Sequence, residues 1–391
     1  MRIHSRATAC LRAGLFGASL AAALVSCGGG GDNMPMSSMT PAAVTPTIAS
    51  AFATRTLVAD SGTGAEHVDP NLVNAWGIAF NPTGFVWVAD NGTSLSTLYD
   101  GNGVPQTLVV EIPPGSAGAS NPTGIVFNSG ATFQVTQNGV SGSSAFIFAS
   151  ENGTLSGWSP AVNRTNAILA VDTGATGAVY KGLATATFSG ASYLYAADFR
   201  NARVDVYDST WNRVTLPGGA FSDPNLPAGY APFGIQNIAG TLYVTYALQD
   251  ADAEDDVAGP GHGYVDAYDT AGMLLRRVAS AGPLDSPWGL ALAPADFGAF
   301  GGMLLVGNFG DGRINAYDLG AMTSTGEAVA VGPLHSAKGP PLQIDGLWAL
   351  QFGNGAGAGS KNTLFFTSGP DDEAHGLFGS LTPAGPPGHN R

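Results

Sequence analysis

Cysteine is almost absent from this chain of 391 residues, since Cys10 and Cys27 are the two that it contains. The residues after Cys27 therefore have no disulfide, and their stability must come from a buried core and from hydrogen-bonded sheets. Charge is also scarce, because only 11% of the residues are charged while 44% are hydrophobic. This balance excludes a disordered chain and leaves ample material for a core.

Basic residues are few as well. The chain has 15 Lys and Arg against 29 Asp and Glu, and Arg2, Arg6 and Arg12 precede Cys27. Such an acidic surface offers no basic stripe to neutralise phosphates, so nucleic-acid binding is excluded. The motifs H-E-x-x-H, G-x-S-x-G and the P-loop are missing too, which removes the zinc-peptidase, α/β-hydrolase and NTPase readings.

One hydrophobic run stands out, LFGASLAAALVS at 15–26, and it is too short for a spanning helix, which needs ~20 residues. Three Arg precede this run, as in a cleavable export signal. The run ends in Leu24-Val25-Ser26-Cys27, which resembles the bacterial lipobox. That resemblance implies acyl chains on Cys27, a lipid anchor in the cell envelope and, with Gly28 following, sorting to the outer membrane.

The sequence predicts four segments. They are the signal (1–27), a flexible tether (28–47) rich in Gly and Ser, a β-domain (48–382) and a mobile tail (383–391). We expect the protein to be a monomer that meets the membrane through its acyl chains.

The β-domain is self-similar. A glycine followed by an apolar strand recurs every 47 to 58 residues, at Gly77, Gly124, Gly182, Gly234, Gly289 and Gly346. Each of these strands is followed by a second apolar strand, and several units show a third and a fourth. Six units of four short strands predict an all-β, six-bladed β-propeller. We expect the glycines where six backbones converge on the central channel, because a Cβ there would crowd the next blade.

The ends of the repeat array predict how the ring closes. The sixth unit stops after HGLFGSL (375–381) without a fourth strand, whereas an unassigned strand, FATRTLVAD (52–60), precedes the first unit. Pairing the two would satisfy backbone groups that an open edge exposes. A further prediction concerns Asp100, Asp208, Asp269 and Asp318, which end third strands and should cap the turns that follow.

The glycine strands, such as NPTGIVF (121–127), and second strands ending in Ala-Asp, such as YLYAAD (193–198), resemble NHL-type six-bladed propellers. The segments 246–269 and 287–318 resemble an uncharacterised bacterial family of secreted NHL-like propeller proteins, over about 52–382. This resemblance implies the fold and an exported location, and no activity.

Polar residues gather where first strands begin and second strands end. These ends adjoin in an antiparallel pair, so they should form a ring around the channel mouth. The candidate ligand or metal residues are Asn74, Asp90, Asn121, Glu151, Asp198, Asn308 and Asp345, with Lys181 and Ser286 beside them. Oxygen-bearing side chains around an axis suit a hard cation such as Ca²⁺. A resemblance to gluconolactonase-type propellers would imply a catalytic divalent cation there.

A second candidate metal site is the loop that contains Asp250, Asp252, Glu254, Asp255 and Asp256, although a solvated acidic loop explains it equally well. It lacks the EF-hand spacing. The sequence favours a non-catalytic, envelope-anchored propeller that binds a protein, glycan or small ligand at the channel mouth. The alternative is a metal-dependent hydrolase of the lactonase type in the same place.

Overall fold

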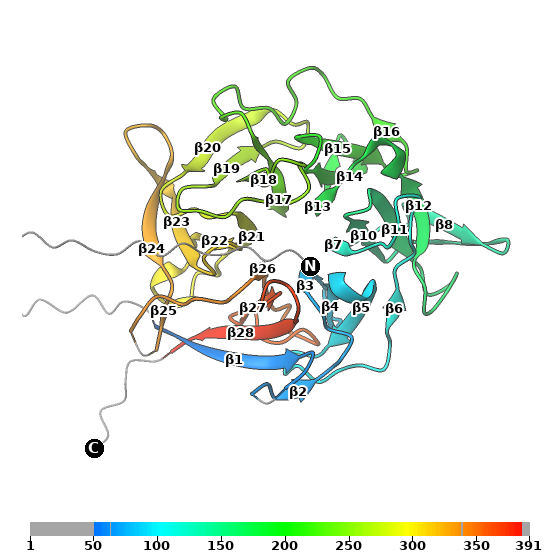
Figure 1. The fold of residues 1–391 in the computed structure, drawn as a ribbon, viewed down its shortest axis with the longest axis horizontal. Helices are drawn as coiled ribbons and strands as arrows, with labels where there is room; N and C mark the ends of the chain where they lie inside the picture. Colours follow the sequence, from blue (N-terminus) through cyan, green and yellow to red (C-terminus); the bar gives the residue numbers. More distant parts are fainter. Residues whose placement is uncertain (1–50, 63, 338, 385–391) are drawn as a thin grey trace, which may run out of the picture. The chain divides into compact units, whose positions relative to one another are not determined.

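The computed structural model describes residues 51–62, 64–337 and 339–384, and these form six blades arranged radially around a central axis, each built on four strands (Figure 1). The predictions for 1–27, 28–47 and 385–391 lie outside the described residues. The helical elements of the described part are three 3-10 turns, η1 (Asn91–Thr93), η2 (Gly174–Thr176) and η3 (Gly298–Phe300). No helix among these residues is long and apolar enough to cross a membrane.

Each blade is an antiparallel meander that runs from the axis outward. Blade 1 is β3 (Ala75–Ala79), β4 (Val86–Asp90), β5 (Leu95–Tyr99) and β6 (Val110–Glu111). Blade 2 is β7 (Pro122–Phe127), β10 (Phe146–Ser150), β11 (Thr154–Trp158) and β12 (Ile168–Asp172). Blade 3 is β13 (Tyr180–Phe188), β14 (Ala191–Asp198), β15 (Arg203–Asp208) and β16 (Arg213–Val214).

The second half of the ring repeats this plan. Blade 4 is β17 (Tyr230–Ile238), β18 (Thr241–Leu248), β19 (Tyr264–Tyr268) and β20 (Leu274–Ser280). Blade 5 is β21 (Pro287–Leu292), β22 (Leu304–Asn308), β23 (Ile314–Met322) and β24 (Ala328–Pro333). Blade 6 is β26 (Leu347–Phe352), β27 (Leu364–Ser368), β28 (Leu377–Pro383) and β1 (Ala51–Ala59). The six-bladed architecture predicted from the repeat is confirmed.

Four short strands lie outside the repeat and were not predicted. β8 (Gln134–Gln137) and β9 (Val140–Ser143) form a separate hairpin within blade 2, and β2 (His67–Val68) and β25 (His335–Ser336) pair with β1 in parallel. The outer strands of blades 1 and 3 have two residues each.

The ring is closed by β1, as predicted. β1 pairs antiparallel with β28 from Phe52 opposite Pro383 to Ala59 opposite Leu377. Strand β28 therefore continues beyond the predicted domain end at 382, and the nitrogen of Ala384 donates to the oxygen of Ala51 at 2.7 Å. In Figure 1, the blue β1 lies beside the red β28, so the first and last described strands share one sheet.

The core is divided among the interfaces between blades. Six clusters of buried hydrophobic residues each join two neighbouring blades, and the cluster between blades 5 and 6 also receives Phe52 of β1. The Phe52 ring is 1% exposed and lies 4.7 Å from the ring of Phe297 between centroids. Burial between blades therefore stabilises the closure as well as the ring.

The predicted role of the glycines holds for five of six. A Cβ on Gly77 would lie 2.5 Å from the Thr123 oxygen of the next blade, and Gly234 and Gly289 meet the next blade's backbone even more closely. Gly346 is the exception, because it has a positive φ of 62° and faces Gly369 of its own blade. The register places Ala349 at the equivalent position of blade 6, directly after Trp348. The repeat was therefore misaligned by three residues there.

Three of the four predicted turn caps are present. The Oδ1 of Asp100 accepts from the nitrogens of Asn102 and Val104 at 2.8 and 2.9 Å. Asp208 and Asp269 accept from turn nitrogens in the same way, whereas Asp318 lies inside β23 and accepts from the nitrogen of Gly320 in the same strand. These four Asp residues thus have structural roles.

Replacing Phe52 with Ala should destabilise the domain by about 3–5 kcal/mol, because a fully buried aromatic ring is lost at the closure. Urea unfolding of the full chain measures this change. Phe188→Ala is the matched control, since Phe188 is 41% exposed, and it should cost far less. Equal decreases in the free energy of unfolding for the two variants would show that the closure by β1 makes no special contribution to stability.

Candidate functional site

One residue from each blade occupies the centre of the channel near the mouth. These residues directly precede the close-approach positions and are Trp76, Thr123, Lys181, Phe233, Trp288 and Trp348. The pairing register of the first two strands shifts at this point in every blade. Such a bulge redirects a side chain, and here it accompanies an aromatic cluster on the axis.

Aromatic rings close the channel. The Trp76 and Trp348 rings stack with centroids 3.5 Å apart, and the Trp288 ring meets both edge-on at 6.0 and 5.8 Å. Phe233 and Phe309 pack against Trp348 at 5.8 and 4.1 Å. The Nε1 of Trp288 donates to the Lys181 oxygen at 2.9 Å, which fixes the cluster to blade 3. The mouth therefore has a closed aromatic floor.

A buried lysine, Lys181, lies against this aromatic floor. Lys181 is 2% exposed, and its Nζ lies 5.3 Å from the centroid of the Trp76 ring. The Nζ lies 2.5 Å from Oε1 of Glu151 in blade 2 and 3.0 Å from Oδ1 of Asp255 in the blade 4 loop. Burial lowers the pKa of Lys181, but the charges of Glu151 and Asp255 outweigh it and raise that pKa above its usual value. Lys181 is thus held as an ammonium ion.

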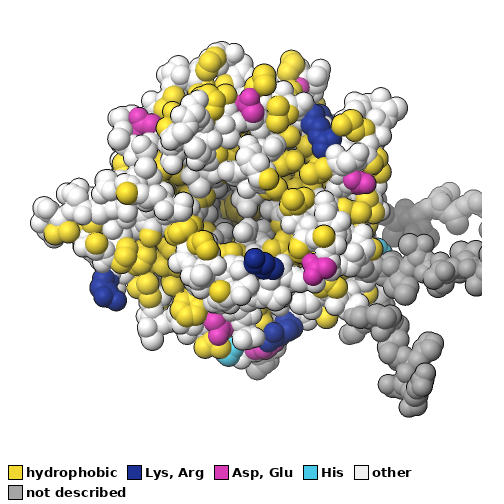
Figure 2. Space-filling view, turned by 180° about the vertical axis from the view of Figure 1, so that it is seen from behind, with side chains coloured by type: hydrophobic (Ala, Val, Ile, Leu, Met, Phe, Trp, Pro, Cys, Tyr) yellow, Lys and Arg dark blue, Asp and Glu magenta, His cyan; other side chains and the backbone are white. Residues whose placement is uncertain are grey.

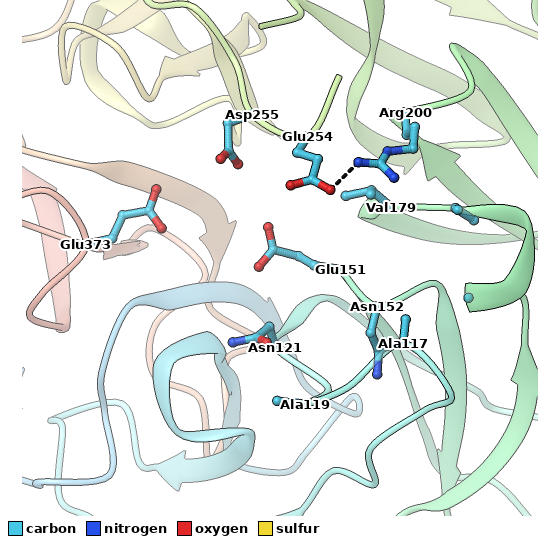
Figure 3. Close-up of a pocket in the computed structure, with 13 residues that line it drawn as sticks. Ala117, Ala119, Asn121, Glu151, Asn152, Val179, Arg200, Glu254, Asp255 and Glu373 are labelled. Atoms are coloured by element: carbon cyan, nitrogen blue, oxygen red, sulfur yellow. Dashed lines mark hydrogen bonds and ion pairs between the residues drawn. The ribbon is translucent and has the colours of Figure 1, made fainter. Parts of the chain in front are cut away.

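Carboxylates from three blades surround a pocket of about 480 Å³ at the mouth. Its polar lining consists of Asn121, Glu151, Asn152, Arg200, Glu254, Asp255 and Glu373. Figure 3 shows the carboxylates of Glu151, Asp255 and Glu373 directed toward a common space, while Glu254 turns to Arg200. The pocket thus has more negative than positive groups, and both nearby cations are already paired.

Glu373 is the one lining carboxylate with no ion pair in the described residues. Its Oε2 accepts from Nδ2 of Asn74 at 2.6 Å. Burial, together with the charge of Glu151, raises the pKa of Glu373 to about 7. Glu373 ends a run of three non-glycine residues with positive φ, Asp371, Asp372 and Glu373 at 61, 54 and 65°. Such a run is costly and directs this side chain inward.

The acidic loop is fixed by contacts within the protein. Oδ1 of Asp250 accepts from the Glu254 nitrogen at 2.9 Å, and Glu254 and Asp255 form ion pairs with Arg200 and Lys181. Asp252 is exposed, whereas burial raises the pKa of Asp256 to about 6. The described residues contain no group of three or more His, Cys, Asp and Glu side chains that could hold a metal ion. The loop's calcium prediction therefore lacks a ligand cluster.

The other predicted residues lie at the mouth end of their blades but not in one cluster. Asn74 bonds to Asn91 at 3.2 Å and accepts from Nε1 of Trp348 at 3.1 Å, close to the axis. Nδ2 of Asn121 donates to the Asn91 oxygen at 3.2 Å at the pocket edge.

The remaining four do not line the pocket. Asp90 is fully buried beside Thr97, with a pKa raised well above its usual value by burial, and Asp198 pairs with Arg203 at 3.0 Å. Asn308 donates to the Pro283 oxygen at 2.8 Å, and Asp345 accepts from the Asp371 nitrogen at 2.9 Å. Asp198, Asn308 and Asp345 thus bond to loop atoms, whereas Asp90 bonds to strand β5.

Sequence reasoning missed Glu373 and Arg200 and placed Lys181 beside Asp198 instead of at the axis. The pairing of Tyr180 with Asp198 is present in the backbone, but the ammonium group points to Glu151 and Asp255. A signal for Lys181 did exist, because a lysine in the apolar strand YKGLATA is unusual unless it is paired. Glu373 gave no signal of this kind.

The fold and the closed axis define this protein as a six-bladed β-propeller. A solved structure of a protein of unknown function from Bacteroides thetaiotaomicron aligns with a TM-score of 0.53 and 12% identity. The alignment covers 85% of this chain and 76% of that one, and it supports the fold alone.

Sequence comparison identifies relatives. The uncharacterized protein R648 of Acanthamoeba polyphaga mimivirus is 35% identical over 83% of this chain and 78% of its own length. The uncharacterized protein L690 of the same virus is 34% identical over 83% of this chain and 84% of its own. The chain belongs to the family that contains these proteins. No protein-family model matches it. Because these relatives are viral, the expected bacterial origin of the family remains a prediction.

Glu373 should make the protein less stable as the pH rises from about 4.5 to about 7. The folded state holds its proton up to about 7, whereas the unfolded chain loses it near 4.5, so folding is favoured at the acidic end. A shift of this size corresponds to on the order of 3 kcal/mol. Glu373→Gln removes this contribution.

The measurement is urea unfolding of the wild type and Glu373→Gln between pH 5 and pH 8, and the two curves should diverge as the pH rises. Comparing the variants isolates Glu373 from Asp256, whose raised pKa acts in the same direction, and from His375, which titrates two residues away. Parallel curves would show that Glu373 is not buried against Glu151 and Asp255.

Proposed function

We propose that this protein is a non-catalytic binding propeller whose mouth pocket takes a small organic cation. The observation that carries the proposal is the pocket of about 480 Å³ above the aromatic floor, in which Glu373 faces the space without a cation of its own. A ligand amine can donate to Glu373 and to the amide oxygens of Asn121 and Asn152, which also line the pocket.

The charges of the pocket favour this ligand class. Four carboxylates line it, while Arg200 and Lys181 are engaged with Glu254, Glu151 and Asp255. An anionic ligand would have to compete for paired cations, whereas an amine meets an uncompensated carboxylate. The pKa of Glu373 is raised by burial and by the nearby charge of Glu151, and the charge of Lys181 offsets only part of this rise.

The same geometry disfavours the metal-dependent hydrolase as a second function. The ammonium group of Lys181 already occupies the position beside Glu151 and Asp255 that a divalent cation on the axis would need. A Lys ammonium and a divalent cation cannot share two carboxylates without strong repulsion. We therefore rank amine binding above lactonase chemistry.

The location is part of the proposal. The export signal and the cysteine in Leu24-Val25-Ser26-Cys27 support a bacterial lipoprotein held in the outer membrane through Cys27. Residues 28–47 would then place the propeller at a distance from the membrane surface.

Putrescine should bind to the full chain, and succinate, which has the same number of carbons and opposite charge, should not. Isothermal titration calorimetry measures both. Binding should strengthen as the pH rises through about 7, because Glu373 then ionises. Glu373→Gln should weaken binding at least about tenfold, the effect of losing one charge-assisted hydrogen bond.

Glu111→Gln is the control, because Glu111 is exposed on β6 and bonds to Asn166 at 2.8 Å, outside the pocket. It should leave putrescine binding unchanged. Binding of succinate but not putrescine would overturn the proposal. The metal-dependent hydrolase would be favoured instead by two results together. The protein would bind Ca²⁺ stoichiometrically and lose this binding in Glu151→Gln, and it would show no response to putrescine.

Cys27→Ser should release the protein from the membrane. Acyl chains on the cysteine thiol are the predicted anchor, and serine cannot be lipidated in the same way. Fractionation of bacterial cells followed by detection of the protein tests this. An unchanged membrane fraction for Cys27→Ser would show that the anchor is not at this residue.

A further inference from the structure

A second pocket opens at the other end of the channel, away from the mouth. It has a volume of about 270 Å³ and is lined by residues near the ends of first strands. Its lining residues are Ile78, Ala79, Phe80, Ile125, Val126, Phe127, Ala184, Thr185, Gln236, Asn237 and Gln351. None of these residues is charged, in contrast to the mouth. In the view from behind, Figure 2 shows a central hollow surrounded mostly by hydrophobic and uncharged side chains, with one basic and one acidic side chain close to it.

This lower pocket is separate from the mouth. A ring of six aliphatic residues, one from each blade, narrows the channel to a space of about 30 Å³. The ring consists of Ile78, Ile125, Leu183, Ile235, Leu290 and Leu350. Above it, the stacked rings of Trp76 and Trp348 fill the axis. A ligand in the lower pocket therefore cannot reach Lys181 or Glu373.

Two glutamines interrupt the apolar walls. Two residues beyond each close-approach position, four blades carry small apolar residues, namely Ala79, Val126, Ala184 and Ala291. Blades 4 and 6 carry Gln236 and Gln351 instead, and Nε2 of Gln236 donates to Oε1 of Gln351 at 3.2 Å. The bond uses one donor hydrogen of Gln236 and leaves the Gln236 oxygen and the Gln351 amide hydrogens available.

We propose that the lower pocket binds the ring of a neutral sugar. A pyranose has apolar C–H faces and a polar edge of hydroxyl groups. Phe80 and Phe127, both partly exposed, offer an aromatic wall for the C–H face, and the two amides offer a donor and an acceptor for hydroxyls. The uncharged lining excludes a ligand that needs a counter-ion.

The size of the pocket limits the ligand to one sugar unit. A volume of about 270 Å³ lies at the small end of ligand pockets, which run from about 300 Å³ upward. Asn237 contributes to the wall rather than to the ligand, because its Nδ2 donates to the Thr185 oxygen at 2.8 Å and its Oδ1 accepts from the Gly240 nitrogen at 2.9 Å. Recognition therefore depends on Gln236, Gln351, Phe80 and Phe127.

Saturation-transfer difference NMR with the full chain tests the proposal. The probes are the methyl glycosides of glucose, galactose, mannose and N-acetylglucosamine at millimolar concentration. We expect at least one to bind, with the strongest transfer to ring C–H protons. Gln351→Ala and Phe80→Leu should each weaken binding at least about tenfold, the effect of losing a hydrogen bond or an aromatic face.

Matched controls keep the result interpretable. Gln134→Ala removes a glutamine from the β8–β9 hairpin, and Phe188→Leu removes an exposed phenylalanine outside the pocket lining. Both should bind the sugar like the wild type, and thermal unfolding of every variant reports whether it folds. Gln236→Ala replaces any pocket variant that fails to fold.

Glu373→Gln separates this inference from the proposed function, since it changes the mouth alone and should leave sugar binding intact. The proposal is wrong if no glycoside binds, if binding survives Gln351→Ala and Phe80→Leu, or if it is lost in Glu373→Gln.

Discussion

The close approach of six strands around the axis is the constraint on which the rest of this structure depends. Where Gly77 meets the Thr123 oxygen, and at four equivalent contacts, there is no space for a Cβ. The adjacent bulge sends the preceding side chain toward the axis, so the residue type at one register position decides what fills the channel. In this chain that position holds three tryptophans, a phenylalanine, a threonine and a lysine. The channel is therefore a packed centre and not a pore.

Lys181 shows how one residue in this ring organises the mouth. An ammonium group buried beside indole rings is tolerated because two carboxylates surround it, and those carboxylates come from other blades. Asp255 brings the acidic loop of blade 4 toward blade 3, and the Glu254–Arg200 pair adds a second connection. The acidic loop, which the sequence offered as a candidate metal site, therefore connects blade 4 to blade 3 through two ion pairs. Glu373, which forms no ion pair among the described residues, is the group that the proposed ligand would use.

The repeat made the blades predictable, because glycines and alternating apolar residues recur with the strand period. The closing strand was predictable for a similar reason, since the sixth unit lacked a strand that 52–60 supplied. Side-chain contacts at the mouth were not, because they depend on loops whose paths the repeat does not encode. Glu373 sits on a turn of three positive-φ residues that are not glycine, so the sequence carried no local signal for it. Gly346 misled the alignment because a turn glycine lies three residues before Ala349.

The two ends of the channel differ because each first strand has different residues and loops at its two ends. At the mouth, first strands begin after polar residues such as Asn74 and Asn121, and loops rich in carboxylates close over them. At the lower end, most of the lining residues are aliphatic or aromatic, and the polar ones, Thr185, Gln236, Asn237 and Gln351, are uncharged. The aromatic floor and the aliphatic ring lie between the two ends. Charged side chains thus line one end and uncharged side chains the other, and we expect substitutions at the two ends to act independently because the sites are separate.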